Sequence, residues 1–467
     1  MQQPTRPSLR ALLGAQALRR DAAVSDPLTA VGLAEALAGT NLRCDPADLA
    51  DRSILLAMPD QLSAALTLIA LDGIAARIVL CPGDVDPKYF GETARTAAVD
   101  CIVHGGDPAL APLGLPMVKA DRTVTVAAGH PTTARPTEWI LLTSGTTGAP
   151  KLVRHDLASL TAPIRSSANA QADTVWATFY DIRRYGGLQI FLRAMLGGTP
   201  LVLSHPTEPV DAHLRRLGRR GVTHISGTPS HWRRVLMSGA ANAMSPRYVR
   251  LSGEVADQAI LDALQAAYPR AAVSHAYAST EAGVGFNVID GREGFPAALL
   301  TQSPQDAEVE IRIANDTLQL RSPRTAYDYL DPDQAPIRAG DGFVDTGDLV
   351  ELRGDRYVFL GRRGGVINVG GQKVHPEEVE AVLNQHPAVR MSLVQARRNP
   401  ITGALVVADV VLKPPGGVMP AAADQTALAE EITAHCRAVL RPFKVPSRIR
   451  FVDSLPVAAT GKLARPS

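Results

Sequence analysis

A glycine-rich run of hydroxyl side chains that ends in a lysine is the strongest chemical signal in the sequence. It follows the apolar run 139–142, so we expect it on the loop that leaves a strand. The glycines permit close backbone approach, the hydroxyls donate hydrogen bonds and the lysine supplies positive charge, as polyphosphate binding requires. The spacing does not fit GxxxxGK[ST], and a flexible surface turn is the alternative. The predicted phosphate loop consists of Thr143, Ser144, Gly145, Thr146, Thr147, Gly148 and Lys151.

Two later segments carry groups suited to a nucleotide. Tyr277 offers a flat ring for adenine, Thr280 a hydroxyl for phosphate, and Glu281 a hard oxygen ligand for Mg²⁺. A core position is the alternative for Tyr277. Asp348 ends an Asp-Thr-Gly-Asp run, where an ordinary turn aspartate is the alternative.

Lys462 lies close to the end of the chain, where a lysine is ordinarily a solvated charge. It stands in the segment Leu455–Lys462, which contains Leu-Pro and ends in Thr-Gly-Lys. An ammonium placed beside a reacting phosphate stabilises the charge that develops in the transition state. These two interpretations can be separated only by where the segment folds.

Taken in order, these segments resemble the motifs of the adenylate-forming superfamily, which includes acyl-CoA synthetases, the adenylation domains of nonribosomal peptide synthetases, and luciferases. The similarity covers roughly residues 50–467. Ala278 and Gly364-Gly365 depart from the usual family residues without removing a reactive group. The matching segments are the phosphate loop, Tyr277-Ala278-Ser279-Thr280-Glu281, Asp345-Thr346-Gly347-Asp348, Gly361-Arg362, Gly370-Gly371-Gln372-Lys373-Val374 and Leu455–Lys462.

The resemblance implies an AMP-binding enzyme that joins a carboxylic acid to ATP, releases pyrophosphate and passes the acyl group to a thiol. It implies ATP, Mg²⁺ and CoA as cofactors, with a separate acyl carrier protein as the alternative thiol. The implied catalytic residues are Lys462, Thr280 and Glu281, and Glu281 would also hold the metal. Asp348 would accept the ribose hydroxyls and Arg362 would contact ribose or phosphate. The other implied nucleotide contacts are Ser252, Gly253, Glu254, Tyr277, Ala278 and Ser279.

Two rival functions are a catalytically silent adenylate-binding protein and a kinase-type phosphotransferase. Retention of Lys462, Glu281 and the phosphate loop disfavours the first. The second lacks both a Walker A loop and an HRD-type catalytic loop. The sequence specifies neither the acid nor the oligomeric state.

The acid pocket is expected around the segment that contains Asp181, where amino-acid-activating relatives place an aspartate against the substrate amine. Binding a second carboxylate on the substrate is one role for the neighbouring Arg183 and Arg184, but we expect them to be a solvated pair. The other pocket residues that we predict are Tyr180, Tyr185, Gly186, His224, Ser226 and Phe286.

Alternating strand and helix patterns must position these groups. They predict helix-covered parallel sheets in the first 300 residues, followed by a small β region. A glycine-rich joint at 361–365 then leads to a small α+β unit. The fold class is therefore α/β, with a large N-terminal domain over residues 1–361 and a mobile C-terminal domain over 362–467.

Composition limits the remaining possibilities. The 46% hydrophobic and 20% charged residues are typical of a globular protein, and the net charge of +2 gives no general reason to expect nucleic acid as a partner. The four cysteines form no CxxC pair, so zinc or a disulfide scaffold is not expected. Neither a secretory signal nor a membrane span is expected, and the predicted location is the cytoplasm.

Overall fold

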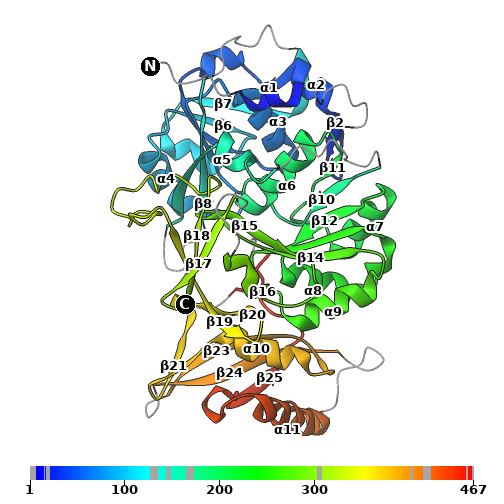
Figure 1. The fold of residues 1–467 in the computed structure, drawn as a ribbon. Coiled ribbons are helices and arrows are strands. Elements are labelled where there is room, and N and C mark those ends of the chain that lie inside the picture. Colours follow the sequence, from blue (N-terminus) through cyan, green and yellow to red (C-terminus); the bar gives the residue numbers. More distant parts are fainter. Residues whose placement is uncertain are drawn as a thin grey trace.

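The computed structural model describes residues 7–14, 16, 22–126, 135–143, 149–164, 173–301, 308–399, 403–413, 422–458 and 461–464. The larger part of the described chain contains three sheets, and a smaller part lies below it in Figure 1. No helix among the described residues is both long and apolar enough to cross a bilayer.

The first sheet has seven strands, and its central strands are parallel. Antiparallel pairs close both edges. In spatial order the strands are β3 (Gly39–Leu42), β7 (Met117–Val126), β6 (Cys101–His104), β4 (Ser53–Ala57), β5 (Arg77–Leu80), β8 (Glu138–Thr143) and β9 (Lys151–Asp156).

The second sheet has eight strands and is parallel except at its two edges. Its order is β15 (Gly283–Val288), β14 (Ala272–Ser279), β13 (Tyr248–Ser252), β12 (His224–Gly227), β10 (Trp176–Thr178), β11 (Leu201–Val202), β1 (Ala23–Ser25) and β2 (Ala30–Gly32). The third sheet is antiparallel, in the order β16 (Phe295–Pro296), β20 (Arg356–Arg362), β19 (Val344–Arg353), β18 (Thr317–Arg321) and β17 (Glu310–Ala314).

Helices cover the two larger sheets. One core joins α3 and α6 to inward-facing residues of β4 and β10, so these helices lie between the two sheets (Figure 1). Every residue of α3 is buried, and Asp60 caps it by accepting the Ser63 N–H at 2.9 Å. The helices of the larger part are α1 (Leu9–Gly14), α2 (Leu33–Ala38), α3 (Gln61–Leu71), α4 (Phe90–Thr96), α5 (Leu157–Thr161), α6 (Tyr185–Leu196), α7 (Val210–Arg219), α8 (Pro229–Met237) and α9 (Gln258–Ala267).

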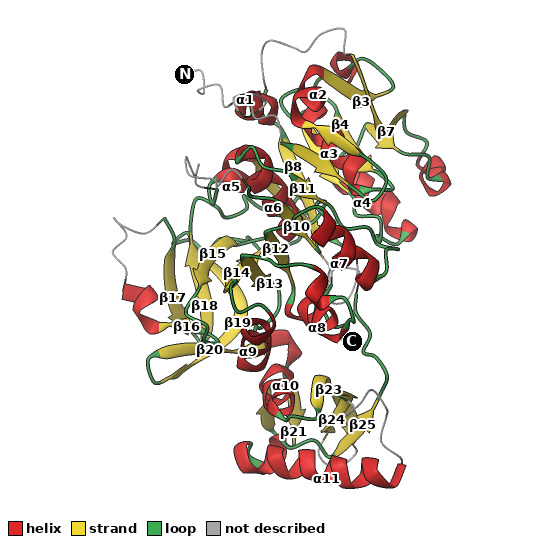
Figure 2. Ribbon diagram, turned by 90° about the vertical axis from the view of Figure 1, so that its right-hand side faces the viewer, coloured by secondary structure: helices red, strands yellow, loops and turns green. Residues whose placement is uncertain are grey.

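The smaller part has its own apolar core. Helix α10 packs against β20 and α9, whereas α11 lies on the outer side, away from the larger part (Figure 2). At the contact, Asn384 donates to the Asp257 carboxylate at 3.1 Å. The elements are β21 (Ile367–Val369), β22 (Gln372–Val374), α10 (Pro376–Gln385), β23 (Val389–Asn399), β24 (Gly403–Leu412), α11 (Ala422–Val439) and β25 (Arg448–Phe451).

The α/β class predicted from the sequence is confirmed, including the β region after residue 300. The parallel expectation is correct for the sheet centres and wrong at their edges. All four cysteines are free, and three of them are buried.

Candidate active site

The carboxyl ends of three parallel strands form the floor of the site. Strands β12, β13 and β14 run in the same direction, so the residues that follow them lie along one edge of the second sheet. This edge carries Ser252 at the end of β13 with Gly253 and Glu254 after it, and Thr280 and Glu281 after β14. It also carries Thr228, which caps α8 immediately after β12.

Lys462 reaches this edge from the far end of the chain. Thr228 Oγ1 donates to the Gly461 carbonyl at 2.6 Å, and the Leu463 N–H donates to Glu254 Oε1 at 2.8 Å. These two bonds hold the backbone on either side of Lys462 against the larger part. A methyl group on Gly253 would lie 3.4 Å from Lys462 Cε and 3.9 Å from its Nζ. The structure therefore brings Lys462 and Gly253 together.

The surroundings of Lys462 disfavour its charged form, so a bound anion would stabilise the ammonium. Burial and then repulsion from Arg362 lower the pKa of its ammonium. The carboxylates of Glu254, Asp348 and Glu281 act in the opposite direction. Lys462 thus interacts electrostatically with Arg362, Asp348 and Glu281, which the family resemblance assigned to ribose, phosphate and metal.

Asp348 is held by a tyrosine and an arginine. The Tyr277 hydroxyl donates to Oδ2 at 2.5 Å, and Arg362 Nε donates to Oδ1 at 3.1 Å. Each carboxylate oxygen retains a lone pair, so Asp348 can still accept two ribose hydroxyls. The Tyr277 ring stacks with Phe286 and Phe359, each at a centroid distance of 5.6 Å. Tyr277 therefore belongs to an aromatic cluster as well as to the site.

Glu281 and Lys151 meet at Tyr329. The Tyr329 hydroxyl donates to Glu281 Oε1 at 3.2 Å, and Lys151 Nζ lies 5.0 Å from the centre of its ring. His155 Nε2 donates to the Thr280 carbonyl at 2.7 Å, which fixes the backbone of that segment. The phosphate-loop residues Ser144, Gly145, Thr146, Thr147 and Gly148 lie outside the described residues, between Thr143 at the end of β8 and Lys151 at the start of β9.

The predicted acid-pocket residues separate into two groups. The Tyr180 hydroxyl donates to the Ser252 carbonyl at 2.7 Å, and a methyl on Gly186 would contact the Tyr180 ring at 3.5 Å. Ser226 lies on β12, next to the strand β13 that ends at Ser252, and Tyr185 is buried at the start of α6.

Three predicted residues take other positions. Phe286 stacks on Tyr277. The His224 ring packs on Trp176 at the amino end of its strand, the opposite edge from Ser252, so the structure does not bring it to the site. Both oxygens of Asp181 accept hydrogen bonds from Arg183.

The expectation that Arg183 and Arg184 are a solvated pair was wrong. Arg183 is 3% exposed and forms an ion pair with Asp181 at 2.5 Å. Arg184 forms an ion pair with Asp84 at 2.6 Å. A buried guanidinium requires a carboxylate and hydrogen-bond acceptors. Arg183 finds them in Asp181 and the Met58 carbonyl, and these bonds fix the loop before α6.

The sequence analysis missed the residues that receive the C-terminal segment. Thr228 and Pro229 begin α8, and a Thr-Pro pair after an apolar strand is a helix-start signal that could have been read. Tyr329 has no such local signal.

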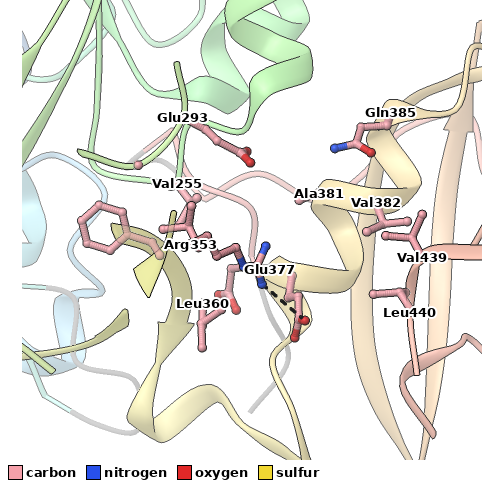
Figure 3. Close-up of a pocket in the computed structure, with 14 residues that line it drawn as sticks. Val255, Glu293, Arg353, Leu360, Glu377, Ala381, Val382, Gln385, Val439 and Leu440 are labelled. Atoms are coloured by element: carbon pink, nitrogen blue, oxygen red, sulfur yellow. Dashed lines mark ion pairs between the residues drawn. The ribbon is translucent and has the colours of Figure 1, made fainter. Parts of the chain in front are cut away.

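A cavity of about 230 Å³ lies between β20 and α10, where the two parts of the protein meet (Figure 3). Val358, Leu360, Ala381 and Val382 line it, and Arg353 spans it toward Glu378 at 3.8 Å. None of the predicted site residues lines this cavity. The cavity belongs to the contact between the two parts, and neither Lys462 nor the residues that hold its segment line it.

Acid should destabilise the protein through buried histidines in the site. Burial lowers the pKa of His155 to about 4 and that of His231 to about 3, from an ordinary value near 6.5. Below pH 6.5 the unfolded chain binds protons that the folded chain does not. The free energy of unfolding should therefore fall between pH 6.5 and 4, by about 3 kcal/mol for each imidazole. Urea unfolding across that range measures the effect, and a flat profile would contradict it.

The fold and the site together define a class of protein. It has a large α/β part with a sheet edge whose residues are suited to bind a nucleotide, and a small C-terminal part that places one lysine at that edge. A family model described as "AMP-binding enzyme" matches residues 71–325, and one described as "AMP-binding enzyme C-terminal domain" matches residues 378–462. The chain belongs to the AMP-binding enzyme family.

Individual relatives agree with this assignment. The chain is 26% identical over 359 residues to the human mitochondrial acyl-coenzyme A synthetase ACSM1, covering 70% of this chain and 60% of the synthetase. It is 30% identical over 348 residues to a 2-succinylbenzoate–CoA ligase of Geobacillus kaustophilus, covering 70% of this chain and 67% of the ligase. The fold is that of a benzoate CoA ligase from Burkholderia xenovorans, with a TM-score of 0.80, 22% identity and coverage of 98% and 99% of the two chains.

Proposed function

We propose that the protein is an acid–thiol ligase that uses ATP to convert a carboxylic acid into an acyl-adenylate and then transfers the acyl group to CoA. The observation that carries this proposal is the position of Lys462 against Gly253, among Arg362, Asp348 and Glu281. The family relatives named as CoA ligases support the choice of a thiol acceptor. A kinase-type phosphotransferase would instead release ADP, so the nucleotide product separates the two functions.

In the first step a carboxylate oxygen attacks the α-phosphorus of ATP, the bond to the β-phosphate breaks and pyrophosphate leaves. Negative charge then grows on the acyl, phosphoryl and departing oxygens. The Lys462 ammonium, preorganised by the Thr228 and Glu254 contacts to its backbone, stabilises that charge. Asp348, which accepts a hydrogen bond from the Tyr277 hydroxyl, holds the ribose, and Thr280 and the phosphate loop hold the phosphates.

Glu281 is the residue that would hold Mg²⁺. A single carboxylate suits this ion, because Mg²⁺ retains water and takes most of its other ligands from substrate phosphates. Its hydrogen bond from Tyr329 leaves the remaining oxygen lone pairs available. The metal would neutralise phosphate charge, and the protein's own contribution is to aim one oxygen at it.

The second step requires the thiol to reach the adenylate, so Lys462 has to withdraw. We propose that the unit 362–467 rotates relative to 1–361 about the joint after β20. Gly361 has a φ of +128°, and added methyl groups on Gly364 and Gly365 would meet no atom within 4 Å. The backbone at Gly364 and Gly365 is therefore open enough to change its torsion angles. Gly361 lies against the Glu377 side chain and Arg363 forms an ion pair with Asp345 at 3.1 Å, so the rotation would have to break these contacts. The β21–β22 turn, with Gly370 and Gly371, would then face the site.

Acid-dependent exchange of labelled pyrophosphate into ATP tests this function. A panel of carboxylic acids should include at least one that supports exchange, and turnover with a thiol should release AMP and not ADP. Addition of CoA should then yield the thioester. Transfer only to an acyl carrier protein would change the proposed acceptor from CoA to that protein. Folded protein that binds ATP but shows no exchange with any acid of the panel would contradict the ligase function and favour a non-catalytic adenylate-binding protein.

A further inference from the structure

One face of the second sheet carries a row of polar side chains where an apolar row would be expected. Val249 and Leu251 of β13 are fully buried in the core beneath α8 and α9. Side chains alternate along a strand, so Arg250 points to the opposite face. The strand register places Arg250 between Ser226 of β12 and Ser274 of β14, and Thr178 of β10 beyond Ser226.

This face looks toward α6, which packs against β10 and β14. Tyr180 closes it at the strand ends, through its hydrogen bond to the Ser252 carbonyl. Burial raises the pKa of the Tyr180 and Tyr185 hydroxyls, and the Arg250 charge acts in the opposite direction on both. The guanidinium of Arg250 therefore lies near two phenol rings that the sequence assigned to the acid pocket.

Neighbouring arginines have carboxylate partners. Arg183 pairs with Asp181, Arg247 with Asp173, and Arg324 with Glu308. In the part of the chain that the structure describes, no carboxylate forms an ion pair with Arg250 or with Arg193 of α6, which donates only to the Pro163 carbonyl at 3.3 Å. The acidic side chains outside that part are Asp21 and Asp306 alone.

Arg193 and Arg250 also lie near enough to repel each other. Burial, followed by repulsion from Arg250, lowers the pKa of Arg193 to about 10. A partly buried guanidinium without a counter-charge is costly, and the cost rises when a second one lies nearby. An anion bound between α6 and β13 would remove both penalties.

The reacting carboxylate cannot be that anion. It has to lie beyond the strand ends, beside Lys462 and the α-phosphate. Arg250 stands two residues before Ser252, so it is roughly 7 Å deeper along the strand. A ligand that spans the two places needs an anionic group at each end.

We propose that Arg250, assisted by Arg193, binds a second carboxylate on the acid substrate, so that the protein activates dicarboxylic acids in preference to monocarboxylic ones. This rests on the proposed function and names the substrate class of the same site. One carboxylate of the diacid becomes the adenylate, and the other remains an ion pair with the guanidinium throughout both steps.

The experiment compares succinic, glutaric, adipic and phthalic acids, each with its monomethyl ester, in pyrophosphate exchange with the full-length protein. At least one diacid should exceed its ester by about 10- to 100-fold in kcat/KM, the usual effect of a hydrogen-bonded ion pair. Arg250→Leu should remove that preference while KM for ATP stays unchanged. Arg250→Lys should restore part of it, and Arg247→Leu, one residue before the same strand, should leave it intact.

Each result decides the matter. Equal use of esters and diacids by the wild-type protein, or an unchanged preference in Arg250→Leu, would overturn the diacid inference and leave the ligase function standing. Should Arg250→Leu fail to fold, the ester comparison on the wild-type protein decides alone. Exchange with none of these acids, but with other monocarboxylic acids, also overturns the inference, whereas exchange with no acid at all overturns the proposed function itself.

Discussion

Lys462→Ala is expected to lower the rate of acid-dependent ATP–pyrophosphate exchange by about 100- to 1,000-fold. The ammonium is the cation that the C-terminal part delivers to the edge formed by β12, β13 and β14, close to Asp348 and Glu281. Its removal leaves the charge on the departing pyrophosphate without that stabilisation. ATP affinity should change little, because the nucleotide contacts proposed for Asp348, Thr280 and the phosphate loop are left in place. Exchange kinetics and an ATP titration measure the two quantities.

Two control variants make this result specific. Lys88→Ala removes a lysine whose side chain is 64% exposed and whose partner is Asp86, and it should leave exchange unchanged. Lys462→Arg retains the charge but changes its shape and reach, so it should recover only part of the activity. A Lys462→Ala variant with wild-type exchange would show that the contact with Gly253 has no catalytic meaning.

Gly461→Ala should lower exchange by roughly 30- to 1,000-fold without removing any reactive group. Gly461 has a φ of +77°, and a methyl there would lie 1.7 Å from Cε1 of the buried His231 ring. The hydrogen bond from Thr228 to the Gly461 carbonyl could not survive that displacement. Lys462 would be present but held away from the site.

Gly354→Ala is the matched control, because Gly354 also has a positive φ of 62° but a methyl there would meet nothing within 4 Å. It should cost some stability and no exchange activity. Adding His231→Ala to Gly461→Ala should open space for the methyl and recover part of the exchange rate. Normal exchange in Gly461→Ala alone would mean that the C-terminal segment does not dock in this way during adenylation.

The sequence was a good guide wherever a local pattern determined the structure. The strand and helix patterns predicted the helix-covered sheets of the first 300 residues and the β region that follows them, because each apolar run matches the burial of one element. The order of the motifs indicated the family, which the family models confirm.

Contacts between distant residues could not be obtained in this way. The Thr228–Gly461 hydrogen bond joins residues 233 positions apart, and the Tyr277–Asp348 bond joins residues 71 apart. His224 and Ser226 belong to one strand, and only the register shows that His224 lies at the wrong edge for the site. Asp181 has the right residue type for an amine, but Arg183, two positions later, accounts for its oxygens.

The central claim is that the Lys462 ammonium acts on the nucleotide in the first step and withdraws for the second. Rapid-quench measurement of thioester formation from preformed acyl-adenylate and CoA, compared between the wild-type protein and Lys462→Ala, tests it most directly. The account predicts thioester rates within about twofold of each other, alongside the loss of adenylation of about 100-fold or more. An equal loss in both steps would contradict it, because the lysine would then serve the fold or the adenylate and not the first transition state.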